Sequence, residues 1–232
     1  MHLALIGDLV ASRLHADRAG VQAALGALLA DLNRELGPSV LAAPLALTAG
    51  DEIQALFREL PRAAPRPRAH RAVEALQGIT DELATFEQPV VFGLGLGLIS
   101  TGPLPPPPGQ AESAAVLDGS CFHRAREALE RAQKSRGWVA CSGFPSDFNT
   151  MLDGLFEVMG ALRSGWTAKQ RSYALDMRRL ERQKDLAELH HVSPSVVSES
   201  LKAASFEAIL HGEEAARFLL ARAADEGQPE DA

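Results

Sequence analysis

The sequence predicts an α+β fold in two parts: a split βαβ domain over residues 1–143 and an all-α domain over residues 144–222. Three observations support this prediction. In the first part, short apolar runs typical of buried strands alternate with amphipathic helical patterns. Two of these runs meet acidic turns, Gly7-Asp8 and Gly50-Asp51. After residue 145 the pattern is helical throughout.

The bulk composition limits the classes of protein that the chain can be. Its 232 residues are 46% hydrophobic and 23% charged, which is ordinary for a soluble globular protein. A net charge of −7 argues against a surface basic enough to coat nucleic acid, but it allows a small local contact. The two cysteines lack metal-ligand spacing, and no apolar stretch approaches the ~20 residues of a membrane span. We therefore expect a cytoplasmic protein with no membrane partner.

The first predicted strand covers residues 2–6, a short apolar run that Gly7-Asp8 ends. Residues 17–36 carry leucines and a valine at three- and four-residue intervals, which predicts a helix that Gly37-Pro38 stops. Two further strands are expected over residues 40–48 and 52–57. The turn between them, with its Gly-Asp pair, is typical of a β-hairpin.

A second amphipathic helix is predicted over residues 70–86 and a third over residues 118–134. Between them, the strand predicted over residues 90–100 contains Gly93, Gly95 and Gly97, and glycine in a strand indicates close approach by another backbone or a ligand. A fifth short strand is expected over residues 138–141. The resulting order, β-α-β-β-α-β-α-β, is a ferredoxin-like plan with an added helix and strand.

The two acidic turns are the first candidate functional feature. In a split βαβ sheet the first strand and the hairpin lie side by side, so Asp8 and Asp51 should project from the same edge. Two nearby carboxylates repel each other unless a cation or a proton intervenes. Mg²⁺ suits such a pair, because it binds one or two carboxylates and completes its shell with water and phosphate oxygens. The sequence therefore predicts that Asp8 and Asp51 bind Mg²⁺.

The turn that follows Asp8 precedes a helix and is expected to hold a phosphate through its amides and polar side chains. The residues predicted to bind a nucleotide or phosphate are Leu9, Val10, Ser12, Arg13 and Gly50.

These motifs resemble two families of nucleotide cyclases. Residues 8–12, Asp-Leu-Val-Ala-Ser, resemble the first metal-binding turn of class III nucleotidyl cyclases. Residues 49–53, Ala-Gly-Asp-Glu-Ile, resemble the hairpin of those cyclases and that of the GGDEF diguanylate cyclases. The resemblance implies a palm-like fold in which the aspartates at these two places bind metal, and a homodimer.

Other cyclase positions are not matched. The base-reading lysine is replaced by Leu47, and the catalytic Asn and Arg are replaced by His123 and Glu127. The catalytic residues are therefore unknown, with His123 and Arg126 as candidates, and enzymatic activity stays open.

A closer resemblance is to the SatD family, and it spans nearly the whole chain. It depends on four motifs that occur in order. They are Ile6-Gly7-Asp8-Leu9-Val10-Ala11-Ser12-Arg13, Gly50-Asp51-Glu52-Ile53-Gln54, the glycine-rich segment from Gly93 to Ser100, and Phe122-His123-Arg124-Ala125-Arg126-Glu127-Ala128.

Residues 183–204 have the spacing of a helix-turn-helix. Leu186 and Ala187 should face inward from the first helix, and Val197 and Leu201 from the second. Ser193 caps the second helix and is followed by Pro194, a favoured first residue. His191 stands where a left-handed residue, usually Gly, is expected. The side chains predicted to contact DNA are Ser193, Ser195, Ser198, Glu199 and Lys202, with Arg178, Arg179, Arg182 and Lys184 on phosphates.

Together these features predict a DNA-binding transcription regulator whose first domain binds a nucleotide or phosphate ligand with Mg²⁺. One alternative is an active metal-dependent nucleotidyl cyclase or nucleotidyltransferase. Another is a non-catalytic interaction or dimerisation protein, in which the C-terminal helices form a hairpin for a protein partner. The acidic tail, residues 223–232, is expected to be disordered.

Overall fold

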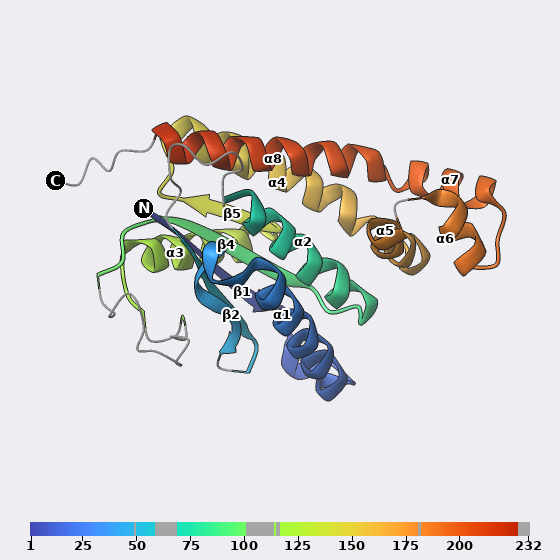
Figure 1. Ribbon diagram of the computed structural model, residues 1–232, viewed down its shortest axis with the longest axis horizontal. Helices are drawn as coiled ribbons and strands as arrows, with labels where there is room; N and C mark the ends of the chain where they lie inside the picture. Colours follow the sequence, from blue (N-terminus) through green and yellow to red (C-terminus); the bar gives the residue numbers. More distant parts are fainter. Residues whose placement is uncertain (49, 59–68, 101–113, 115–116, 181, 227–232) are drawn as a thin grey trace.

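The computed structural model describes residues 1–48, 50–58, 69–100, 114, 117–180 and 182–226. It contains a five-stranded mixed sheet surrounded by helices, which confirms the predicted α+β class (Figure 1). No helix in the described part of the chain is long and apolar enough to span a bilayer.

The sheet has the strand order β2-β3-β1-β4-β5. β1 is antiparallel to both of its neighbours, β3 is antiparallel to β2, and β5 is parallel to β4. This is the order that the split βαβ plan requires, so β1 and the hairpin do lie side by side. The strands are β1 (His2–Leu9), β2 (Leu41–Thr48), β3 (Glu52–Phe57), β4 (Val90–Gly97) and β5 (Val139–Ser142).

Helices cover both faces of the sheet. α1 (Arg18–Val40) and α2 (Ala69–Thr85) pack on one face, and α3 (Ser120–Ser135) packs on the other. The predicted end of the first helix falls where the helical conformation is interrupted. Gly37 is non-helical, with φ 63° and ψ 177°, and a further short helical stretch follows it to Val40. Gly37-Pro38 therefore stops the first helix as predicted, and the residues to Val40 form a separate stretch beyond the kink.

Side chains along β1 alternate between the two faces, as expected for a strand. Leu3 and Leu5 belong to the core cluster under α1 and α2, whereas Ala4 and Ile6 belong to the cluster under α3. Asp8 continues the even series and therefore lies on the α3 side of the sheet.

α3 approaches β4 at backbone distance because three glycines face it. A Cβ added to Gly93 would overlap the Ala125 carbonyl oxygen, and one added to Gly95 would overlap the Cys121 carbonyl oxygen. A Cβ on Gly97 would lie 2.6 Å from the Cys121 nitrogen. The alternating glycines predicted a close approach, and the backbone that approaches is α3.

The C-terminal helices follow the sheet without a break in the core. One cluster of buried apolar side chains contains Leu3 of β1, Leu76 of α2 and Ile209 near the chain end. α8 runs back from the α6–α7 end to pack on α4 and α2 (Figure 1). The division into two domains stays a prediction. The helices are α4 (Ser146–Ser164), α5 (Ala168–Leu180), α6 (Gln183–Leu189), α7 (Pro194–Ala203) and α8 (Phe206–Glu226).

α8 also includes the start of the predicted acidic tail. The helix extends to Glu226 and Ala223 is buried, so residues 223–226 are helical. The rest of the tail, residues 227–232, lies outside the described residues.

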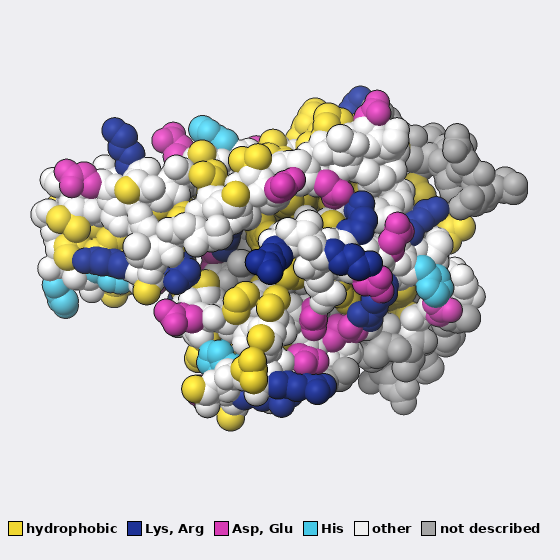
Figure 2. Space-filling view, turned by 180° about the vertical axis from the view of Figure 1, so that it is seen from behind, with side chains coloured by type: hydrophobic (Ala, Val, Ile, Leu, Met, Phe, Trp, Pro, Cys, Tyr) yellow, Lys and Arg dark blue, Asp and Glu magenta, His cyan; other side chains and the backbone are white. Residues whose placement is uncertain are grey.

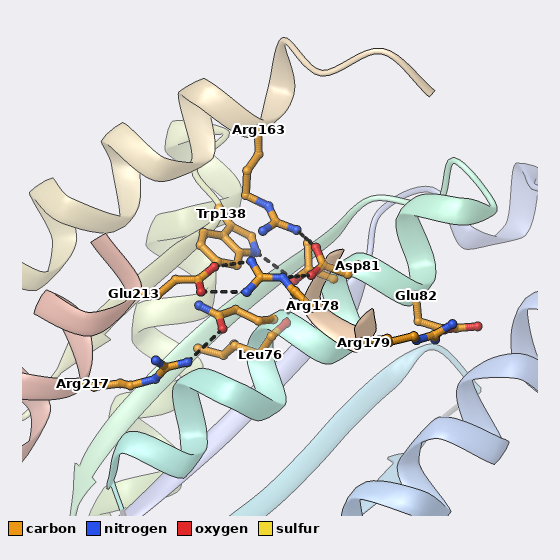
Figure 3. A network of polar contacts seen from close by, with 11 residues as sticks. Leu76, Asp81, Glu82, Trp138, Arg163, Arg178, Arg179, Glu213 and Arg217 are labelled. Atoms are coloured by element: carbon orange, nitrogen blue, oxygen red, sulfur yellow. Dashed lines mark hydrogen bonds and ion pairs between the residues drawn. The ribbon is translucent and has the colours of Figure 1, made fainter. Parts of the chain in front are cut away.

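A buried network of charges joins α2 to the C-terminal helices (Figure 3). Asp81 of α2 pairs with Arg163 of α4, and its second oxygen lies 2.7 Å from Nε of Arg178 in α5. Arg178 also pairs through both terminal nitrogens with Glu213 of α8. The Asp81 and Glu213 side chains are 3% and 1% exposed, so each of these charges depends on its partners for compensation.

Adding one methyl group at Gly95 should separate α3 from the sheet. We expect Gly95→Ala to lower the free energy of unfolding by about 3 kcal/mol or more, because the obstructing atoms are backbone and cannot rotate away. Urea denaturation of the purified chain measures this. Gly26→Ala is the matched control: its Cβ meets no atom within 4 Å, so it should stabilise α1 by about 0.5–1 kcal/mol. Equal stability of the two variants would contradict the close backbone contact between α3 and β4.

Candidate functional site

The structure brings the two predicted metal-binding aspartates to one edge of the sheet. Asp8 near the end of β1 is in register with Glu52 at the start of β3, and Asp51 immediately precedes Glu52 in the hairpin turn. The Leu9 N–H donates to the Asp51 carbonyl oxygen at 3.1 Å, which ties the turn to the end of β1. We call Asp8, Asp51 and Glu52 the carboxylate edge.

One oxygen of each aspartate accepts a hydrogen bond from a different element. Oδ2 of Asp8 accepts from Nε2 of Gln133, near the C-terminal end of α3, at 2.7 Å. Oδ2 of Asp51 accepts from the buried hydroxyl of Ser12 at 2.9 Å. Both aspartates are therefore held in place by the protein.

The pKa values of Asp8 and Glu52 shift in opposite directions. The pKa of Asp8 is raised, first because burial disfavours its charged form and second because of the negative charge of Asp51. The pKa of Glu52 is lowered, chiefly because Arg126 donates to it through both terminal nitrogens. Glu52 thus has a permanent counter-charge, whereas Asp8 and Asp51 repel each other. A divalent cation between the two aspartates would relieve that repulsion.

The backbone amides available in the turn after Asp8 are not the ones predicted to bind phosphate. The Leu9 N–H is engaged by Asp51, and the Val10 N–H donates to the Pro89 carbonyl at 2.9 Å. Neither amide is available to a phosphate. The predicted residue Gly50 likewise has its carbonyl engaged, by Gln22 at 2.8 Å.

The N–H groups of the three following residues are candidates for binding a phosphate instead. Ala11 is left-handed, with φ 54°, and the short 3₁₀ helix η1 (Ser12–Leu14) follows it. No acceptor for the N–H groups of Ala11, Ser12 and Arg13 is found among the described residues. Successive amides in this conformation form a concave anion-binding nest. A left-handed alanine has no sequence signal, so local patterns could not locate the nest. The exposed Arg13 side chain lies within it in sequence.

The two catalytic candidates lie about one turn apart on α3, but only one of them reaches the carboxylate edge. His123 is 75% exposed, pairs with Asp118 at 3.1 Å, and lies ten residues, or about 15 Å of helix, from Gln133. It is therefore not part of the carboxylate edge. Arg126 does reach that edge, where it pairs with Glu52. Gln133 was not predicted; its spacing of seven residues from Arg126, two helical turns, is the signal that places both on one face.

A cleft of about 1280 Å³ begins at Asp8 and continues between the sheet and the C-terminal helices. Its walls come from the end of α2, the α3–β5 connection, α4 and the start of α5. Basic and acidic side chains lie close together where the projecting helices meet the main body (Figure 2). The lining residues used below are Asp8, Arg136, Trp138, Arg163, Trp166 and Arg171.

The described residues contain no group of three or more His, Cys, Asp or Glu side chains that could hold a metal. This excludes a zinc-type cluster within that part of the chain. Mg²⁺ requires only one or two carboxylates, so Asp8 and Asp51 are a chemically suitable donor pair.

α6 and α7 form the predicted pair of helices around a tight turn. His191 has φ 53°, as its position requires, and the Ser193 side chain accepts from the Val196 N–H. Leu186, Ala187, Val197 and Leu201 are buried between the helices. The predicted DNA-contacting residues Ser193, Ser195, Ser198, Glu199 and Lys202 are all exposed.

The basic residues expected to contact phosphates are less available than the sequence indicated. Arg178 is buried between Asp81 and Glu213, so it cannot reach DNA. Arg179 pairs with Glu82 at 3.2 Å, Arg182 with Asp185 at 2.7 Å, and Lys184 approaches Glu188 at 3.9 Å. Counting charges along this segment overestimated its exposed positive charge.

Comparisons with known proteins give one extensive match. The family model described as SatD family matches residues 2–220. No curated protein matches the chain. A bacterial light-regulated adenylyl cyclase structure is 11% identical, with a TM-score of 0.41 over 60% of this chain and 42% of that one. A regulator of polyketide synthase expression from Bifidobacterium adolescentis is 15% identical, with a TM-score of 0.27 over 94% of this chain and 80% of that one.

The opposite pKa shifts predict opposite effects of neutralising two neighbouring carboxyls. In metal-free buffer at neutral pH, Asp8→Asn should raise the melting temperature, because ionised Asp8 is penalised in the folded state. That gain should disappear as the pH falls below the usual value of 3.8, where the carboxyl is protonated whether folded or unfolded.

Glu52→Gln should instead lower the melting temperature at neutral pH, because Glu52 loses its ion pair with Arg126. This difference in melting temperature from the wild type should disappear as the pH falls through the lowered pKa of Glu52. Thermal denaturation across a pH series measures both variants. Destabilisation by Asp8→Asn in the absence of metal would contradict the repulsion between Asp8 and Asp51.

Proposed function

The chain belongs to the SatD family, and from the geometry of its carboxylate edge we propose that it is a cytoplasmic regulator that binds a nucleotide or another phosphate compound with Mg²⁺. The observation that carries the proposal is that Asp8 and Asp51 lie together beside the amides of Ala11, Ser12 and Arg13, for which the described residues offer no acceptor. A carboxylate pair binds the cation, and an amide nest binds the phosphate that accompanies it.

The site is better suited to holding this ligand than to converting it. Arg126, which reaches the carboxylate edge, is engaged by Glu52 through both terminal nitrogens. Leu47 stands at the base-reading position of the cyclases, and its side chain packs against the core. Glu127 stands at the position of the transition-state arginine, and it accepts from the Ser142 hydroxyl at 3.1 Å. These contacts favour ligand binding over cyclase chemistry.

In the proposed regulator, α7 reads DNA as the second helix of a helix-turn-helix. The left-handed His191, the Ser193 cap and the buried contacts between α6 and α7 support this assignment. The exposed face of α7 presents small polar side chains and Lys202, which can approach base edges and phosphates. We expect modest affinity, because most neighbouring arginines are paired.

Nucleotide binding should depend on both metal ligands. We expect at least one common nucleotide to raise the melting temperature only with Mg²⁺; at about 100 times its dissociation constant, a ligand stabilises the fold by about 2.7 kcal/mol. Asp8→Asn and Asp51→Asn should each abolish the shift. Asp31→Asn, an exposed carboxyl on α1, should keep it.

The same screen discriminates between regulator and enzyme. If no common nucleotide or simple phosphate gives a Mg²⁺-dependent shift, the ligand half of the proposal is wrong. Cyclic or linked products from labelled ATP or GTP would instead establish an enzyme.

DNA binding should depend on the exposed start of α7. We expect Ser195→Glu to weaken binding to genomic fragments about tenfold, because a carboxylate would face the phosphates, while a Glu in the first turn leaves the helix stable. Fluorescence anisotropy measures this. Ser146→Glu is the matched control, since it adds the same charge to the first turn of α4. Equal loss in both variants would show that α7 does not contact DNA.

A further inference from the structure

We infer that the cleft contains a second anion-binding position, at the corner between α4 and α5, where Arg163 and Arg171 hold a phosphate group of the ligand. The inference extends the proposed function, because the ligand would then span from the carboxylate edge to the C-terminal helices. It can be tested separately, since this position does not require Mg²⁺.

The first evidence is that two arginine side chains each have a buried donor atom with no acceptor among the described residues. Arg163 is 9% exposed, and its Nη2 donates to Asp81, but its Nη1 has no acceptor among the described residues. Nε of Arg171 is also buried without an acceptor in the described part of the chain. Buried donors are normally satisfied, so each such exception requires an explanation. Both side chains line the cleft, from the two sides of the α4–α5 corner.

The second evidence is the distribution of charge along the cleft. Asp81 and Asp153 line the cleft but are paired with Arg163 and Arg131. The carboxylates of Asp8, Glu87 and Glu157 also line it, as do Arg136 and Arg171. No ion pair of Arg136 or Arg171 is found among the described residues. A metal–phosphate ligand suits a cleft of this kind, because carboxylates favour its cation and arginines its phosphate oxygens.

The position of Arg171 links the ligand to the helices proposed to read DNA. Arg171 lies in the first turns of α5, which packs against α6 and α7. Trp166, immediately before α5, donates from its indole nitrogen to the Ala204 carbonyl, just after α7, at 2.7 Å. A phosphate that draws Arg163 and Arg171 together would therefore set the orientation of α5 and, through it, of the α6–α7 pair.

The two tryptophans of the chain provide a direct measurement. The guanidinium carbon of Arg163 lies 4.9 Å from the centre of the Trp138 ring and 5.1 Å from that of the Trp166 ring, and both rings line the cleft. Because the sequence contains no other tryptophan, all of its tryptophan fluorescence comes from this position. Inorganic pyrophosphate and tripolyphosphate are suitable probes, since neither absorbs in this range.

We expect pyrophosphate or tripolyphosphate, added to the full chain in EDTA, to change this fluorescence to saturation. Arg171→Met should raise the dissociation constant about tenfold or more, because it removes a charge-assisted hydrogen bond. Arg171→Lys, which keeps the charge but loses the planar fork, should have an intermediate effect. Arg34→Met, at an exposed site on α1 outside the cleft, should bind as the wild type does. Arg163 is not substituted, because the buried network depends on it.

Three outcomes decide the inference. A saturable change in EDTA that requires Arg171 supports it, even if Mg²⁺-dependent nucleotide binding fails. A change that Arg171→Met leaves intact, in a variant whose melting temperature equals that of the wild type, overturns it. The absence of a saturable change with either probe also overturns it. If Arg171→Met does not fold, Arg171→Lys provides the same comparison.

Discussion

The close contact between α3 and β4 is the constraint on which the candidate site depends. Gly93, Gly95 and Gly97 leave three successive positions without a Cβ on the face of β4 that α3 covers, so the two backbones touch there. That contact fixes where the other face of the helix points. Arg126 then reaches Glu52, and Gln133 reaches Asp8. If α3 moved outward by the width of a methyl group, Glu52 would lose the ion pair that lowers its pKa, and Asp8 would lose the hydrogen bond that partly offsets its burial.

The buried charges around Asp81 provide the second constraint, because they hold the C-terminal helices against α2. Ion pairs this deeply buried give little net stability, but each is strongly destabilising when one partner is removed. Their effect here is geometric: the links from Asp81 to Arg163 and Arg178, and from Arg178 to Glu213, set the distance between the sheet and α4, α5 and α8. The cleft occupies the space that remains. Its carboxylate end and its arginine end therefore belong to parts of the chain that this network joins, together with the apolar core they share.

Prediction from sequence was most successful where local pattern and chain topology agreed. The apolar runs located each strand in the described part of the chain, and the split βαβ order placed Asp8 beside the hairpin that carries Asp51. The pattern around Ser193 and Pro194 located the start of α7, and the left-handed His191 followed from the turn that precedes it. Prediction was less complete after Gly37-Pro38: the helical conformation is interrupted there as predicted, but the sequence did not predict the short helical stretch that follows to Val40.

The sequence by itself determined the fold class, the order of elements and the meeting of Asp8 with Asp51, because periodicity and short-range sterics specify strands, helices and turns. Only the tertiary structure decided which donors and charges are available. Gln133 binds Asp8 from 125 residues away, Arg178 is used in the core and not on the surface, and the amides of Leu9 and Val10 are occupied while those that follow have no acceptor among the described residues. The physical reason is that a polar group's partner depends on which distant element packs against it, and no local pattern encodes that.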